Sequence, residues 1–298
     1  MSSSKPSSKK TRSWRNKNLL PAGFVKLEDK ATPLKEFQDL FQLFRAIANG
    51  DLSNSHSLMD QSTMKKYKES AEEISTAASR GSALSWNETE WRSECHTPLL
   101  RFLTKAQSTF CQLFQDQAWS TLNLEEGVAL LPHKPDYTVA FKVMNRSSDN
   151  SFSRIILDRL LADLHPYFDD ASSAAYPFLT AESKSSFGVE YEAENQCAES
   201  SIKMLHKFRA LGSEADDLPV MSVSLIGYYV NVYLACSRAM DGQVSYLLQK
   251  VWAGILVDDY MCLAFHLMLH AYLNWIKIKL QPILARKVNL RMQSQSAL

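Results

Sequence analysis

Apolar and polar positions divide the chain into helix-like stretches near its two ends and alternating stretches between them. In PLKEFQDLFQLFRAIANG, which begins at Pro33, apolar residues recur every three or four positions, as in an amphipathic helix. A weaker stripe follows in MKKYKESAEEISTAASRG. We therefore expect residues 33–84 to form an N-terminal helical extension. The apolar face of residues 34–47 must be covered, either by the main domain or as a docking face for a protein or a second copy.

Alternating apolar residues, many of them β-branched or aromatic, predict strands in the middle of the chain. The predicted strands are residues 136–143, the run ending in AESK at Lys184, one or two strands in LPVMSVSLIGYYVNVYLACSR with a bend at Gly227, and VSYLLQKVWAGILV. AWSTLNLEEGVALLP is also strand-like. This pattern predicts an α/β fold with a mixed central sheet flanked by helices.

Helix signals surround these strands. Ser85 and Glu88 have capping-box spacing, and Pro98 should kink or restart the helix that follows. A short helix, SRIILDRLLADL, is expected outside the sheet. The apolar run at 261–280 contains two histidines, an asparagine and two lysines, which favours a helix packed on a sheet over a membrane span. Asp258 and Asp259 could cap this helix.

Composition is that of a globular protein, since 45% of the 298 residues are hydrophobic and 22% are charged. The five cysteines are widely spaced and odd in number, which favours reduced thiols in an intracellular protein, nuclear or cytoplasmic. The basic start has no apolar segment of the kind found in secretion signals, so we expect no secretion. Residues 1–32 are expected to form a disordered basic tail, with nuclear import or nucleic-acid contact as possible roles, and residues 291–298 a second disordered tail. The net charge of +1 means that any nucleic-acid surface must be local.

Candidate chemistry centres on Glu182 and Lys184, which lie two residues apart on a predicted strand and therefore share a face. A carboxylate and an ammonium at the end of an apolar strand are costly to bury unless they pair or hold a ligand. Other polar groups admit plainer interpretations. Those groups are a solvated helix face formed by Glu192, Glu194 and Glu199, a histidine pair packed on the sheet at His266 and His270, and a small buried thiol at Cys197.

The order of these elements resembles the PD-(D/E)XK nuclease superfamily. Asp136 in LPHKPDYTVAFKV corresponds to the acid of the PD strand, Glu182-Ser183-Lys184 to the E-x-K strand, and Gln196 to the glutamine of the next helix. WNETEWRSECHTPLLRFL, with Glu94 as its acid, and YEAENQCA are similar to segments of a fungal branch of this superfamily.

The resemblance implies a restriction-endonuclease-like domain over residues 85–290 that hydrolyses phosphodiester bonds with Mg²⁺ or Mn²⁺. Asp136, Glu182 and the backbone carbonyl of Ser183 would bind the metal, and Lys184 would sit beside the attacking water. Glu94 could bind a second ion or orient the first, although Glu88 or Glu90 could take its place. Gln196 would contact the site or the nucleic-acid backbone.

Three hypotheses follow from this resemblance. The first is a Mg²⁺-dependent nuclease acting on DNA rather than RNA, with no membrane partner. The second is a catalytically degenerate protein of the same fold that binds nucleic acid or protein. The third, an accidental match, fails if Asp136 and Glu182 lie on neighbouring strands.

Overall fold

The computed structural model describes residues 15, 19–20, 22–27, 38–50, 60–106, 110–116, 118–119, 122–123, 129–130, 134–142, 174–209, 218–240 and 243–296. The helical elements are α2 (Gln38–Ala48), α4 (Gln61–Leu84), α5 (Glu88–Trp91), the π-helical turn η3 (Arg92–His96), α6 (Thr97–Ala106), α8 (Glu190–Arg209) and α10 (Asp259–Ser296). The strands are β1 (Phe24–Lys26), β2 (Cys111–Gln115), β3 (Leu122–Asn123), β4 (Ala129–Leu130), β5 (Tyr137–Lys142), β6 (Ala174–Lys184), β7 (Val220–Ile226), β8 (Tyr229–Met240) and β9 (Gln243–Ile255).

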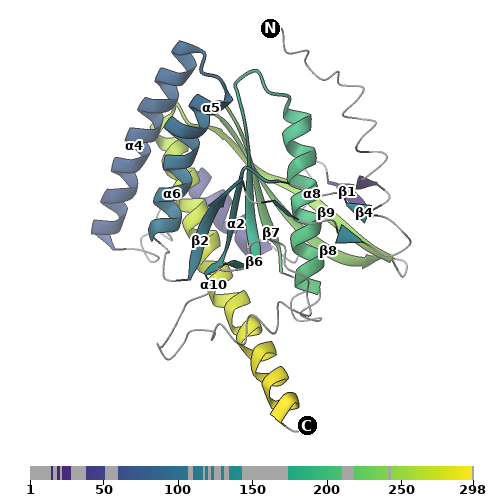
Figure 1. Cartoon of the computed structure of the whole chain (residues 1–298). Coiled ribbons are helices and arrows are strands. Elements are labelled where there is room, and N and C mark those ends of the chain that lie inside the picture. The colour runs from purple at the N-terminus through teal and green to yellow at the C-terminus, as the bar shows by residue number, and fades with distance from the viewer. Residues whose placement is uncertain are drawn as a thin grey trace.

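Seven of these strands form one mixed sheet in the order β1-β9-β8-β7-β6-β5-β2 (Figure 1). β2, β5 and β6 are antiparallel neighbours, whereas β6 and β7 are parallel. A parallel pair needs a long crossover connection, and α8 lies within the one that joins β6 to β7. The predicted α/β class, with a mixed central sheet flanked by helices, is confirmed.

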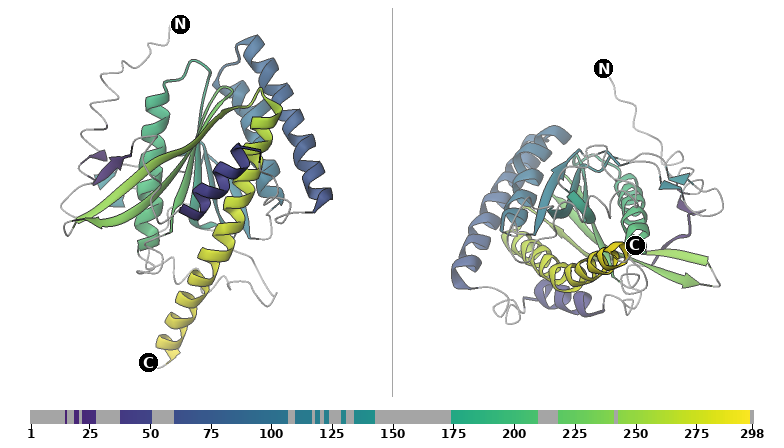
Figure 2. Two further views of the ribbon diagram at one scale, coloured as in Figure 1. Left: turned by 180° about the vertical axis from the view of Figure 1, so that it is seen from behind. Right: turned by 60° about the horizontal axis from the view of Figure 1, so that its bottom comes forward.

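Helices cover both faces of the sheet (Figure 2). On one face, the Ser201 hydroxyl of α8 hydrogen-bonds to the Ser222 hydroxyl of β7 at 2.8 Å. On the other, α10 packs with α2, α4 and α6 around it, and the buried Tyr272 donates its hydroxyl proton to the Phe178 carbonyl of β6 at 2.6 Å. Successive residues of β5 and β6 therefore point into two different helical layers.

The predicted helical extension contributes to the main core. Leu40, Phe44 and Ile47 of α2 are buried, and the Tyr260 hydroxyl of α10 donates to the Ile47 carbonyl at 3.1 Å. The apolar face of residues 34–47 was suggested as a docking site. Within α2, where the structure describes this helix, that face is covered by the rest of the chain. Leu34 and Phe37 lie outside the described residues.

Part of the segment expected to be a disordered basic tail is ordered. β1 pairs in parallel with β9, placing Phe24 opposite Tyr246. Burial of Leu19 and Phe24 stabilises this arrangement, because both remove apolar surface from water. Residues 1–14 lie outside the described part of the chain, as does the predicted helix SRIILDRLLADL. At the other end, α10 continues to Ser296 where a tail from residue 291 was expected.

Helix boundaries near residue 85 also differ from the expected capping box. Ser85 adopts a left-handed conformation (φ 55°) and ends α4, while Asn87 and Glu90 form the reciprocal capping box that begins α5. Asn87, and not Ser85, is the N-cap residue of α5, because its extended backbone directs the side-chain oxygen at the Glu90 amide. Among the described helices, none combines the length and apolar character that a membrane crossing requires.

The two buried histidines of α10 face α4 instead of the sheet. Ser70 hydrogen-bonds to Nε2 of His266 at 3.1 Å, and the Tyr67 hydroxyl to Nδ1 of His270 at 2.8 Å. The two histidines therefore fix the α4–α10 seam, which corrects the expectation that they pack on the sheet. All five cysteines are buried thiols that form no disulfide, as the sequence indicated.

Candidate functional site

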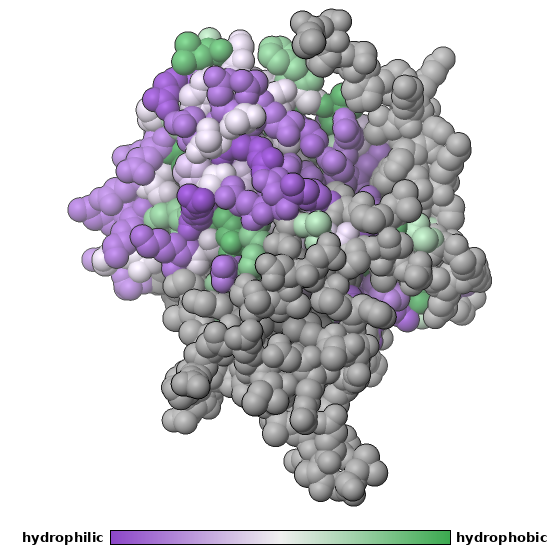
Figure 3. All heavy atoms as spheres, in the orientation of Figure 1, coloured by the Kyte–Doolittle hydropathy of each residue, from purple (hydrophilic) through white to green (hydrophobic). Residues whose placement is uncertain are grey.

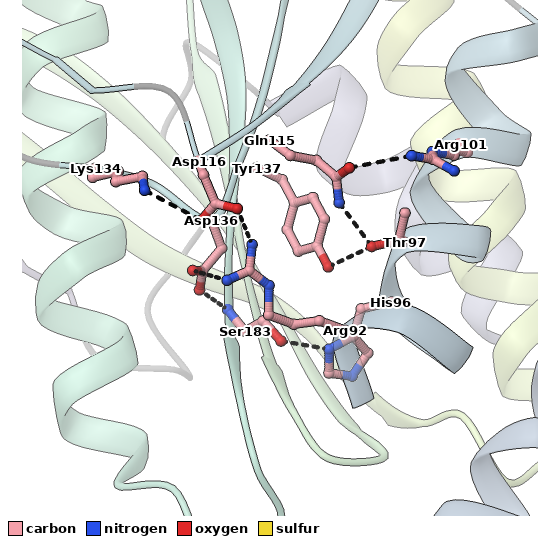
Figure 4. A network of polar contacts seen from close by, with 10 residues as sticks. All are labelled: Arg92, His96, Thr97, Arg101, Gln115, Asp116, Lys134, Asp136, Tyr137 and Ser183. Carbon is pink, nitrogen blue, oxygen red and sulfur yellow. Dashed lines mark hydrogen bonds and ion pairs between the residues drawn. The ribbon is translucent and has the colours of Figure 1, made fainter. Parts of the chain in front are cut away.

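The PD strand and the E-x-K strand are neighbours. β5 and β6 are antiparallel, with Tyr137 opposite Ala181 and Thr138 opposite Thr180. Extending this register by one residue places Asp136 opposite Glu182, and Cβ atoms of opposed residues are about 4.5–5.5 Å apart. Asp136 Oδ2 accepts a hydrogen bond from the Ser183 amide at 2.7 Å. The two halves of the motif thus meet at one end of the strand pair (Figure 4).

The alternation of β6 separates its polar side chains as the sequence predicted. Ser183 points toward η3, where its hydroxyl hydrogen-bonds to Nδ1 of His96 at 2.7 Å. Nε2 of His96 donates to the Gly227 carbonyl at 2.7 Å, so Nδ1 is the acceptor and Ser183 the donor. Burial lowers the pKa of His96 to about 4, although its bond to Gly227 acts in the opposite direction. A neutral imidazole therefore ties the E-x-K strand to the turn after β7.

An arginine outside the predicted set contacts Asp136. The Arg92 guanidinium lies 3.2 Å from Asp136 Oδ1 and donates to Asp116 Oδ2 at 2.8 Å, so it sits between two carboxylates (Figure 4). It also lies over the Tyr137 ring, 5.6 Å from the centroid. Asp116 directly follows β2 and has a left-handed backbone (φ 52°), and its amide donates to the Asp136 carbonyl at 3.1 Å, which holds its side chain beside Arg92. Both oxygens of the Asp136 carboxylate are engaged.

The helix acid that approaches the site is Glu88, not Glu94. The Glu94 side chain is half exposed and lies 3.6 Å from Arg80, on the outer surface. Partial burial raises the pKa of the Glu88 carboxyl, with the charge of Lys184 lowering it and that of Asp136 raising it. Glu88 therefore shares an electrostatic environment with the motif residues, whereas Glu94 lies outside the cluster. The capping role expected for Glu88 belongs to Glu90, which leaves the Glu88 carboxyl directed elsewhere.

The remaining motif residues lie on β6 and on α8, the helix that packs over it. Glu182 is 1% exposed, and Lys184 at the end of β6 is partly buried. The Oε1 atom of Gln196 is buried and accepts no hydrogen bond within the described part of the chain. Burial raises the pKa of the Cys197 thiol well above its usual value, and the charge of Glu182 adds to this shift. Cys197 is the inert buried thiol that the sequence indicated, and not a nucleophile.

The acidic residues of α8 do not form the expected solvated face. Glu194 is 3% exposed and Glu199 is 6% exposed. Glu194 pairs with Arg15 at 2.5 Å and with Lys26 at 2.6 Å, while Glu199 pairs with Lys203 one turn along the helix. The burial of Glu194 follows from the N-terminal segment, which supplies Arg15 and Lys26 and was expected to be disordered.

Arg92 and His96 were not among the predicted site residues, but the sequence contains a signal that links them to Glu88. Glu88, Arg92 and His96 follow one another at four-residue intervals, so they line one side of the segment from α5 through η3. Glu94 falls outside this row. No comparable signal marks Asp116, because its contact with Arg92 depends on where β2 ends and on a left-handed backbone.

The donor chemistry of this cluster suits a hard divalent cation. Carboxylate, amide and backbone carbonyl oxygens are the ligands of Mg²⁺, which needs one or two carboxylates and otherwise keeps water and phosphate oxygens. Asp136, Glu182, the Ser183 carbonyl and the buried Gln196 Oε1 all offer oxygens of this kind. In the described residues, no three His, Cys, Asp or Glu side chains form a group that could enclose a metal. A Mg²⁺ ion would therefore share Asp136 or compete for it with the Arg92 guanidinium.

A scan against protein-family models finds no match for this chain, and a search of curated proteins likewise finds none.

Proposed function

We propose that this protein is a Mg²⁺-dependent nuclease with a restriction-endonuclease-like domain, hydrolysing phosphodiester bonds of DNA. The observation that carries the proposal is the adjacency of Asp136 and the E-x-K strand, with the Ser183 amide on the Asp136 carboxylate at 2.7 Å. The sequence resemblance to the PD-(D/E)XK superfamily requires these segments to be neighbours. An accidental match carries no such requirement.

Each residue has a role in this proposal that follows from its position. Asp136, Glu182 and the Ser183 carbonyl would hold the ion, with Gln196 Oε1 as a further oxygen nearby. Bound Mg²⁺ would neutralise the phosphate and favour ionisation of the attacking water. Lys184 contributes a positive charge at the strand end, suited to stabilising negative charge that develops on the phosphate. Glu88, whose pKa is raised by burial, is suited to exchanging a proton with a water or leaving oxygen.

A second candidate function has its own supporting observation. With Arg92 on one oxygen and the Ser183 amide on the other, the Asp136 carboxylate is already neutralised. A protein that keeps this pairing permanently would be a catalytically degenerate member of the same fold, acting as a nucleic-acid- or protein-binding module. The two functions differ in whether a divalent cation can displace Arg92.

The proposal is tested by measuring metal binding and cleavage separately. Isothermal titration with Mn²⁺ should give a site in the wild type that Asp136→Asn weakens and Glu94→Gln leaves unchanged. Supercoiled DNA, linear DNA and single-stranded RNA are then incubated with Mg²⁺ or Mn²⁺. We expect metal-dependent DNA cleavage that Lys184→Ala abolishes while its circular dichroism stays unchanged. Metal binding without cleavage, or equal inertness of wild type and Lys184→Ala on every substrate, would favour the binding module.

A further inference from the structure

An aromatic patch lies at the edge of the molecule where β6 ends. Phe187 is 67% exposed and Tyr229 is 48% exposed, with Tyr228 beside them partly buried. The Tyr228 and Tyr229 rings lie 4.4 Å apart between centroids. In the space-filling view, small separate hydrophobic spots lie at this end of the molecule, over the end of α4 and over the loop between β6 and α8 (Figure 3). Large aromatic faces in water are unfavourable unless a partner covers them.

Two tight contacts fix the patch around Lys184. The Gly227 amide donates to the Lys184 carbonyl at 2.8 Å, and a Cβ at Gly227 would lie 2.2 Å from Ser186 Oγ. A Cβ at Gly188 would lie 2.4 Å from the Cβ of Lys184, so the loop that carries Phe187 folds directly over the lysine stem. Phe187 and the two tyrosines therefore belong to segments packed on each side of Lys184.

The same patch contacts the helix that carries Glu88 and Arg92. The Tyr228 ring lies 6.3 Å from Trp91, and Trp91 stacks on His96 at 5.7 Å with an interplanar angle of 21°. Tyr228 therefore packs near Trp91, which is fully buried. A rigid aromatic surface loses little conformational entropy when a flat ligand stacks on it.

We infer that Phe187, Tyr228 and Tyr229 form a stacking platform for unpaired bases of a nucleic-acid strand whose phosphate lies at Lys184. This inference rests on the proposed function, and it specifies the substrate as single-stranded next to the reacting phosphate. Every base has a π face, so stacking on Phe and Tyr holds bases without regard to sequence, while the neighbouring lysine attracts the backbone. With a net charge of only +1, the chain as a whole attracts phosphates only weakly, so binding has to come from local groups such as this platform and Lys184.

The test measures binding in EDTA, so that no cleavage intervenes. Fluorescence anisotropy is followed with labelled oligothymidylate and oligouridylate of about twelve nucleotides, and with a blunt duplex of the same length. The full chain should bind single strands more tightly than duplex. Phe187→Ala and Tyr229→Ala should each weaken single-strand binding by about tenfold, and Tyr229→Trp should preserve it. The oligouridylate arm distinguishes RNA from DNA as the source of the bases.

Ile278→Ala is the matched control, because Ile278 is 68% exposed but lies on α10, about 28 Å along the helix from Asp259. It should leave binding unchanged. Equal or tighter duplex binding, absence of single-strand binding, or unaltered binding by both aromatic variants would overturn the inference. Cleavage of duplex DNA unaffected by Phe187→Ala would overturn it while leaving the nuclease proposal intact. Aromatic-dependent binding without cleavage would support the platform and refute catalysis.

Discussion

Arg92 and Asp136 form an ion pair at 3.2 Å on the carboxylate that the nuclease proposal assigns to the metal. The side chains are 23% and 13% exposed, so water screens them only in part. A guanidinium and a divalent cation would occupy the same side of the same group. If the proposed metal binds here, its affinity should therefore depend on a residue that is not itself a ligand.

Arg92→Ala should bind Mn²⁺ about tenfold more tightly than the wild type, because one unit charge at roughly 4 Å contributes on the order of 1–4 kcal/mol. It should also lower the free energy of unfolding by about 1–3 kcal/mol through loss of charged hydrogen bonds to Asp116 and Asp136. Isothermal titration and urea unfolding measure the two effects. Arg101→Ala is the control, since Arg101 donates to Gln115 at 3.3 Å and contacts neither carboxylate. Unchanged Mn²⁺ affinity in Arg92→Ala would mean that the guanidinium does not compete.

Glu88→Gln should reduce metal-dependent cleavage by about 10²-fold or more, the usual contribution of a positioned proton-transfer group. Glu94→Gln should retain activity near the wild-type level, because its carboxylate faces Arg80. Comparison of kcat for the two variants on one DNA substrate measures this. Equal losses in both would argue against assigning the helix acid to Glu88.

Stability should decline as the pH falls below about 6.5. The pKa values of His96 and His266 are both lowered to about 4 by burial, so the unfolded chain takes up protons that the folded chain does not. Each histidine then removes roughly 1.4 kcal/mol per pH unit between about pH 6.5 and pH 4, and neither affects stability above that range. Urea unfolding of the wild type and His266→Gln at pH 7.5, 6 and 5 checks this. The slope below pH 6.5 should be shallower in the variant, and identical slopes would contradict it.

Gly227→Ala should destabilise the fold more than Gly50→Ala. Both glycines have left-handed backbones, with φ 56° and 82°, so an added Cβ costs about 1 kcal/mol at either position. At Gly50 the nearest atom to a Cβ is the Tyr260 hydroxyl at 3.2 Å, whereas at Gly227 it is Ser186 Oγ at 2.2 Å. The two variants share the backbone cost, so the difference between their melting temperatures measures how tightly the loop packs over Lys184. Equal decreases in melting temperature would indicate that the loop accommodates the added Cβ without loss of stability.

The strands could be predicted because alternation is local. Tyr137, Val139 and Phe141 alternate with smaller or polar residues, so the pattern itself identifies β5. The same alternation separates Glu182 from Ser183 onto opposite faces, as the structure has them. Pro98 also marked a real irregularity, since it is the second residue of α6, which begins directly after the π-helical turn.

What could not be predicted depends on contacts between distant segments. Arg15 reaches Glu194 across 179 positions, and this contact buries an acid that helical periodicity alone would leave in water. Asp116 reaches Arg92 only because β2 ends where it does. The choice of Glu88 over Glu94 was open for a related reason, because the π-helical turn changes which helix residues face the sheet.

The number of residues in the π-helical turn sets the orientation of α5 relative to α6. The Thr97 amide bonds to the Arg92 carbonyl five residues back, and Pro98 has no N–H with which to continue a regular ladder. Removing one residue from Arg92–His96 would restore α-helical spacing and rotate α5 by about 100° relative to α6. The seven-stranded sheet would remain, but the guanidinium would no longer face Asp136. Deletion of a single residue in this turn would therefore separate the Asp136 carboxylate from its Arg92 partner.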